Sequence, residues 1–101
     1  MFCFVRDPAL NFDYNLFMFY VYLIQSIVTK EIYVGYTSDI EQRILSHNNG
    51  GNLATKHGVP WELLYVEGYR SERDARIREL KLKHHGNSKR FVKQRIKHSL
   101  L

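Results

Sequence analysis

Two apolar runs of strand length, separated by only five residues, limit most strongly what this chain can fold into. Residues 19–25 and 31–36 are rich in aromatic and β-branched side chains, which favour strands, and residues 26–30 connect them. Parallel strands need a crossover of a dozen or more residues, so this short connection predicts an antiparallel hairpin. Residues 61–69 follow Pro60 and alternate in polarity, which predicts a third strand.

A helix is expected between the second and third strands. Ser38 and Glu41 have the spacing of a capping box, so the helix should begin at Ser38. Asparagine and glycine at 48–51 should end it, because both residue types tolerate left-handed backbone. Its apolar positions are Ile40, Ile44 and Leu45.

Two more helices are expected near the C-terminus. Ser71 and Asp74 again have N-cap spacing, and that helix should reach about residue 85, with Gly86 as its stop. Residues 87–88 can cap a third helix that runs from 89 to about 98. Its inward-facing side chains should be Phe91, Val92 and Ile96.

The resulting order, β-β-α-β-α-α, predicts an α/β (α+β) domain with a three-stranded antiparallel sheet flanked by helices. The length of 101 residues fits one domain with a modest core. Met18 stands directly before the first strand. We therefore expect residues 18–101 to form the domain and residues 1–17 to be an N-terminal extension that need not belong to it.

Charge is distributed unevenly along the chain. Residues 1–69 carry four basic and seven acidic side chains, whereas residues 70–101 carry eleven basic and three acidic ones. A cationic C-terminal third favours a polyanionic partner such as DNA. Solvated helix faces would give the same composition, so charge alone does not decide.

The only cysteine, Cys3, cannot form an internal disulfide, and no cysteine–histidine set has zinc spacing. A reducing compartment fits this composition, so a cytoplasmic location is expected. Charged residues and a proline interrupt the apolar N-terminal stretch, so we expect no membrane span.

Four side chains could act together on a phosphodiester. Tyr22 and Tyr33 fall on the first two strands, and Arg43 and His47 are four residues apart on the following helix, so they share a face. A guanidinium can bind phosphate oxygens, an imidazole can transfer a proton near neutral pH, and a phenol can act as a base if nearby cations lower its pKa. Each residue also has an ordinary explanation. The tyrosines suit strands, Arg43 could pair with a surface carboxylate, and His47 could interact with a helix C-terminus.

Glu79 is a carboxylate in an otherwise strongly basic helix. On a helical wheel it falls near Ala75 and Leu82, so it could point partly inward and hold a hard divalent cation. Pairing with Lys83 or with Arg76 would explain it equally well.

This pattern resembles the GIY-YIG nuclease family. Tyr20-Val21-Tyr22 stands where the family has Gly-Ile-Tyr, and Tyr33-Val34-Gly35 stands where it has Tyr-Ile-Gly. Arg43, His47 and Glu79 follow in the family's order, and the likeness extends over residues 19–93. Tyr20 departs from the family's glycine. The small single-domain bacterial members are the most similar.

The resemblance implies a metal-dependent endonuclease that hydrolyses DNA. Tyr22 would be the general base or would polarise the attacking water, Tyr33 would hydrogen-bond the phosphate or that water, and Arg43 would stabilise the developing charge. His47 would move the proton from the tyrosine, and Glu79 would hold one Mg²⁺ or Mn²⁺ ion. Nucleic-acid contacts are expected from Gly35, Lys83, Arg76 and Arg90. No small-molecule cofactor is expected.

Little sequence specificity is expected, because no helix has the character of a base-reading helix. By analogy with the family, structure-selective rather than sequence-selective cutting of branched, nicked or single-stranded DNA is expected. The main alternative is a non-catalytic or weakly catalytic nucleic-acid-binding module with the same fold. A protein-interaction domain with a basic tail is the third hypothesis. The substrate structure, the pathway and the oligomeric state stay open.

Overall fold

The computed structural model describes residues 6–7, 12–13 and 18–101. Its centre is a three-stranded antiparallel sheet in the order β4-β3-β5, formed by β3 (Phe19–Ser26), β4 (Ile32–Thr37) and β5 (Trp61–Tyr69). The predicted α+β architecture and element order are confirmed, and the predicted bounds of β5 match the observed ones. Two short strands, β1 (Arg6–Asp7) and β2 (Phe12–Asp13), pair with each other and were not expected.

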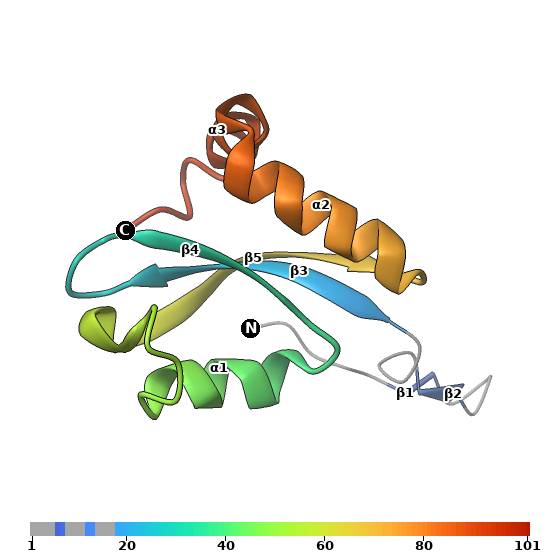
Figure 1. The fold of residues 1–101 in the computed structure, drawn as a ribbon, viewed down its shortest axis with the longest axis horizontal. Coiled ribbons are helices and arrows are strands. Elements are labelled where there is room, and N and C mark those ends of the chain that lie inside the picture. The colour runs from blue at the N-terminus through green and yellow to red at the C-terminus, as the bar shows by residue number, and fades with distance from the viewer. Residues whose placement is uncertain (1–5, 8–11, 14–17) are drawn as a thin grey trace.

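Helices cover both faces of the sheet, as Figure 1 shows. Helix α1 (Ile40–Asn48) lies on one face, and α2 (Glu72–His84) and α3 (Gly86–Arg95) lie on the other. A short 3₁₀ turn, η2 (Lys56–Gly58), precedes β5. Within the described residues, no helix is long and apolar enough to span a bilayer.

The central strand β3 supplies both apolar cores, because its side chains alternate between the two faces. Val21 and Leu23 pack with Ala75, Leu82 and Val92 under α2 and α3. On the opposite face, the core under α1 contains Tyr20, Tyr22, Ile24, Ile40 and Trp61. Because β3 lies between two strands and two helical layers, its side chains from Tyr20 to Ser26 are all buried.

The start of α1 differs from the expected capping box. Asp39, not Ser38, is the N-cap, and its carboxylate accepts a hydrogen bond from the backbone N–H of Gln42. Leu45 is 58% exposed, so it is not a core position, and His47 is the side chain buried near the end of the helix. An imidazole therefore takes the inner position one turn after Arg43.

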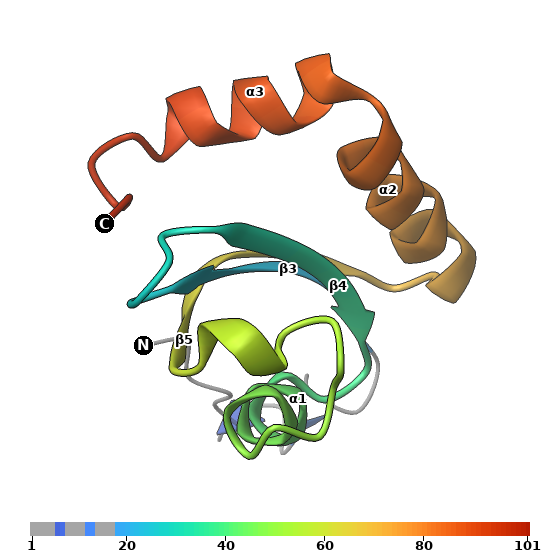
Figure 2. The same ribbon diagram turned by 60° about the vertical axis from the view of Figure 1, so that its left-hand side comes forward.

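The junction between α2 and α3 also differs from expectation. Ser71 caps α2 as predicted, with its hydroxyl accepting from the N–H of Asp74. Gly86 does not end α2 as predicted. The extended backbone of His85 already ends α2, and Gly86 begins α3. α3 therefore starts earlier than predicted and runs off in a new direction (Figure 2). Phe91 is 60% exposed and does not face the core as expected.

One carboxylate joins α2 to β5. Glu67 accepts hydrogen bonds from the hydroxyls of Tyr65 and Tyr69, at 2.6 and 2.5 Å, and from Arg78 Nε and Nη2, at 2.9 and 3.0 Å. Burial would raise the pKa of Glu67, but the hydrogen bonds from Arg78 and the two tyrosines outweigh it and lower that pKa. The ionised form is therefore the one that the fold stabilises.

Replacing Glu67 with glutamine should lower the free energy of unfolding at pH 7 by about 2 kcal/mol, because Arg78 loses its charged partner. A carboxylate whose pKa is lowered by folding stabilises the fold above its unfolded value of about 4.3, and this contribution is lost as the pH falls through the folded value. Urea unfolding of both proteins should therefore differ at pH 7 and converge in acid. Glu62→Gln, at an exposed position of the same strand, is the control and should change little. An equal loss for both variants would contradict the role of Glu67.

Candidate active site

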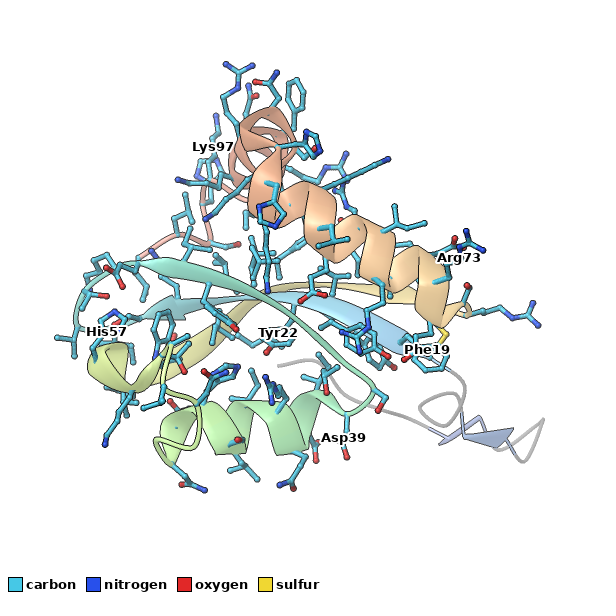
Figure 3. The ribbon with its side chains drawn as sticks, viewed as in Figure 1. Phe19, Tyr22, Asp39, His57, Arg73 and Lys97 are labelled. Carbon is cyan, nitrogen blue, oxygen red and sulfur yellow. The ribbon has the colours of Figure 1, made fainter. Side chains whose placement is uncertain are left out.

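Gly35 creates the space that the Tyr22 phenol occupies. Tyr22 and Gly35 are partners in the register of β3 and β4. A Cβ atom added to Gly35 would collide with the hydroxyl and the adjacent ring carbons of Tyr22. The phenol therefore lies across the edge strand β4 at its glycine, and Figure 3 shows Tyr22 between the sheet and α1.

Helix α1 brings a guanidinium and an imidazole to the Tyr22 hydroxyl. Arg43 Nε donates to this oxygen at 3.2 Å, and His47 Nε2 lies 2.7 Å from it. Tyr22 and His47 are fully buried, whereas Arg43 is half-buried. Among the described residues Arg43 makes no ion pair with Asp39 or Glu41. Arg43 and His47 thus share a helix face, as inferred from the sequence, and that face contacts the Tyr22 phenol.

Burial determines the protonation states of this cluster. Burial raises the pKa of Tyr22 to about 12, although Arg43 acts in the opposite direction. Burial, together with the positive charge of Arg43, lowers the pKa of His47 to about 4. Neighbouring cations were expected to lower the pKa of Tyr22, but burial outweighs their effect. At neutral pH Tyr22 is protonated and His47 is neutral, so the phenol is a donor and the imidazole can accept.

Tyr33 completes one wall of the cluster. Its ring packs edge-on against His47, with centroids 5.3 Å apart, and against Trp61, at 6.5 Å. Lys83 Nζ lies 5.6 Å from the centroid of the Tyr33 ring, within reach of a cation–π interaction. The Tyr33 hydroxyl makes no hydrogen bond to any residue that the structure describes. It is therefore available to a ligand.

Glu79 approaches from α2 on the other side of β4. Its side chain is 13% exposed and pairs with Lys83 at 3.1 Å and with Arg76 at 3.8 Å, so both alternative pairings proposed from the sequence form. Burial accounts for most of the raised pKa of Tyr22, and the negative charge of Glu79 adds to it. Glu79 is thus near enough to the phenol to act on it electrostatically. It also raises the pKa of Arg43, after the larger effect of Tyr22.

The residues predicted to contact nucleic acid lie in different parts of the fold. Arg76 stacks over the ring of Tyr36, 3.7 Å from its centroid, and Lys83 joins Glu79 to Tyr33, so both lie beside the β4 edge. Arg90 belongs to α3, where its guanidinium lies over Phe91. Gly35 is buried and makes room for Tyr22. The structure brings Arg76 and Lys83 to Glu79, and it does not bring Arg90 there.

Thr55 is the residue that sequence reasoning left out. Its side chain is fully buried, and its hydroxyl lies 2.7 Å from His47 Nδ1. Trp61 Nε1 donates to its carbonyl at 2.7 Å, which anchors the loop to the start of β5. Thr55 stands in a polar loop without a periodic pattern, so no local sequence signal indicates its contact with His47.

The metal site predicted from the sequence consists of Glu79 alone. Within the described residues, no three histidine, cysteine, aspartate or glutamate side chains gather closely enough to form a metal site. Mg²⁺ can nevertheless be held through one carboxylate when waters and a substrate phosphate complete the octahedron. The sheltered Glu79 carboxylate, near a phenol and a guanidinium, suits that mode of binding.

Comparisons with known proteins agree with the residue pattern. The family described as GIY-YIG catalytic domain matches residues 18–94. A UPF0213 protein of Clostridium perfringens is 37% identical over 67 residues, 65% of this chain and 71% of the relative. One of Staphylococcus saprophyticus is 36% identical over 73 residues, 71% of this chain and 88% of the relative. The NMR structure of the UPF0213 protein BH0048 of Bacillus halodurans is 27% identical, with 78% and 86% of the two chains covered and a TM-score of 0.49.

Proposed function

The chain belongs to the GIY-YIG family, and from this premise we propose that it is a divalent-metal-dependent endonuclease that hydrolyses DNA phosphodiester bonds and selects structure rather than sequence. The observation that carries the proposal is the Tyr22 hydroxyl, which contacts Arg43 and His47 at once. A buried phenol that meets both a guanidinium and a neutral imidazole is arranged to exchange a proton beside an anion. Residues 18–101 would form this domain, with a cytoplasmic location.

Proton transfer would begin at the attacking water. The water would give its proton to the Tyr22 oxygen as the Tyr22 proton passes to His47 Nε2, 2.7 Å away. This exchange leaves a hydroxide for attack on phosphorus and a protonated His47, and the phenol stays neutral throughout. Since the pKa of Tyr22 is raised to about 12, such an exchange is easier than forming a free phenolate first.

Arg43 and Tyr33 would act on the phosphate. Arg43 uses Nε for Tyr22, so its terminal nitrogens can donate to phosphate oxygens and stabilise their growing charge. The Tyr33 hydroxyl, which has no described partner, would donate to the phosphate or to the attacking water. The negative charge of the phosphate would also favour protonation of His47, whose pKa is low in the free protein.

Glu79 would hold one Mg²⁺ or Mn²⁺ ion, which would supply electrostatic stabilisation of the leaving 3′ oxygen. Lys83 and Arg76, which pair with Glu79 in this structure, would donate to phosphate oxygens of the bound DNA. Other basic side chains of residues 70–101, Arg90 among them, would provide further contacts with the DNA backbone. Gly35 would act through the space it leaves for Tyr22.

Metal addition and removal test the proposal directly. The purified protein should cut nicked, branched or single-stranded DNA in Mg²⁺ or Mn²⁺, and excess EDTA should reduce cutting to background, because the leaving oxygen loses its counter-charge. Binding, followed by fluorescence anisotropy in EDTA, should persist and should weaken steeply with salt.

Each rival hypothesis predicts a different result. A binding module would show the salt-dependent binding and no metal-dependent cutting of any DNA form. A protein-interaction domain would show no DNA binding at moderate salt and a salt slope near zero. Cutting that is equally fast in EDTA would contradict the role of the metal while leaving a nuclease.

A further inference from the structure

The Thr55 hydroxyl contacts the His47 side chain and does not cap its own helical turn. Thr55 is the N-cap residue of η2, where a threonine hydroxyl commonly accepts a hydrogen bond from the first turn, yet here it makes no capping bond. It instead meets His47 Nδ1 at 2.7 Å and lies 3.4 Å from the carbonyl oxygen of Asn52, to which it can donate. The side chain is thus directed toward the imidazole and not toward its own turn.

The backbone around Thr55 fixes this hydroxyl. The N–H of Thr55 donates to the carbonyl of Asn52 at 3.2 Å, and the carbonyl of Thr55 accepts from the N–H of Gly58 at 3.1 Å. Trp61 Nε1 donates to the same carbonyl at 2.7 Å. A hydroxyl held through its own peptide groups, and fully buried, can impose an orientation on the ring that it contacts.

Hydrogen-bond accounting determines which nitrogen of His47 carries the proton. The Tyr22 oxygen accepts from Arg43 Nε, and the buried Tyr22 proton has one acceptor among the described residues, His47 Nε2. Nε2 must therefore be unprotonated, and the proton of the neutral ring sits on Nδ1. Nδ1–H then donates to Thr55 Oγ1, and the Thr55 hydroxyl donates onward to the carbonyl of Asn52.

We propose that Thr55 is a positioning residue that holds His47 in its Nδ1–H tautomer, so that Nε2 stays free to receive the proton of Tyr22. The catalytic consequence rests on the proposed nuclease function, whereas the tautomer itself does not. Without the Thr55 oxygen, the Nδ1–H form would bury an unpaired donor. The Nε2–H form would also leave one donor unpaired, because it would donate to the Tyr22 oxygen and leave the phenol proton without an acceptor. The preference for the Nδ1–H form would therefore be lost, and the population of the Nε2–H form would rise.

Nitrogen-15 NMR of the histidine rings tests the tautomer. Spectra of the wild type, Thr55→Ser and Thr55→Val are compared at pH 7, with His47→Gln used to assign the His47 signals among the five histidines. The wild type and Thr55→Ser should show the Nδ1–H tautomer, and Thr55→Val, which has nearly the same shape, should shift toward Nε2–H. A wild-type His47 in the Nε2–H form would overturn the proposal, even if Thr55→Val did not fold. So would an unchanged tautomer in folded Thr55→Val.

Cleavage provides the second measurement. Thr55→Val should lower the single-turnover cleavage rate by about 10- to 100-fold, by analogy with the loss of partners that orient metal-ligating histidines, with DNA affinity unchanged. Thr55→Ser should restore the rate to within about threefold of the wild type. If the protein cuts no DNA but the tautomer shifts as expected, the nuclease function fails and the positioning role stands. A normal rate in Thr55→Val with a shifted tautomer would refute the catalytic consequence.

Discussion

Replacing Gly35 with alanine is expected to abolish DNA cleavage and to destabilise the fold. The added Cβ would overlap the Tyr22 hydroxyl and ring carbons, and Tyr22 is fully buried, so the ring cannot move without displacing its neighbours. Overpacking of a close-packed interior costs about 3 kcal/mol at the upper end of its usual range. For a domain of this size, the melting temperature should fall by more than about 10 °C.

Gly35→Ala should also slow cleavage directly, apart from its effect on stability. A phenol displaced by about 1 Å would lose its contacts with Arg43 and His47 together, which predicts a loss of at least about 100-fold in cleavage rate at temperatures where the variant is folded. The matched control is Gly86→Ala, because a Cβ at Gly86 meets no atom within 4 Å. It should retain both stability and cleavage.

A double-mutant cycle shows whether the overlap with Tyr22 is the cause. In a Tyr22→Leu background the phenol is absent, so adding Gly35→Ala should cost much less than it does in the wild type. Urea unfolding of the four proteins gives the coupling free energy. Full additivity would mean that Gly35 matters for another reason, such as the backbone of β4 itself.

The hairpin and its site were predictable because short-range patterns determine them. The five-residue connection imposed antiparallel pairing of β3 and β4, and the four-residue spacing of Arg43 and His47 placed both on one helical face. Gly35 was expected to contact nucleic acid. Its actual role depends on the register that sets it opposite Tyr22, which the sequence pattern does not specify.

Residues whose role depends on tertiary contacts were not predictable in the same way. Thr55 acts through a loop anchored by Trp61, and no local pattern encodes that anchor. Phe91 has an apolar side chain at a helical position expected to face inward, but the turn at His85 sets α3 in a direction that leaves the ring exposed. The raised pKa of Tyr22 results from burial, a tertiary effect. Burial outweighs the lowering of this pKa by Arg43, the cation that the sequence did suggest.

Replacing Glu79 with glutamine should separate cleavage from binding. Cleavage in Mg²⁺ should fall by about 1,000-fold, equivalent to about 4 kcal/mol, because the protein ligand of the ion is weakened and the leaving oxygen loses its counter-charge. DNA affinity should be kept or should rise. Lys83 and Arg76, released from their pairs with the carboxylate, become available to phosphates, and the salt dependence of binding should steepen accordingly.

The control for Glu79 is Glu72→Gln on the same helix. Glu72 accepts the hydroxyl of Tyr36 at an exposed position, so its replacement removes the same charge without touching the Tyr22 cluster. Binding of Mn²⁺, measured by titration calorimetry without DNA, should weaken in Glu79→Gln and stay unchanged in Glu72→Gln. Equal cleavage by the two variants would show that Glu79 serves only as the partner of Lys83 and Arg76. Any metal-dependent cleavage would then require a different ligand for the ion.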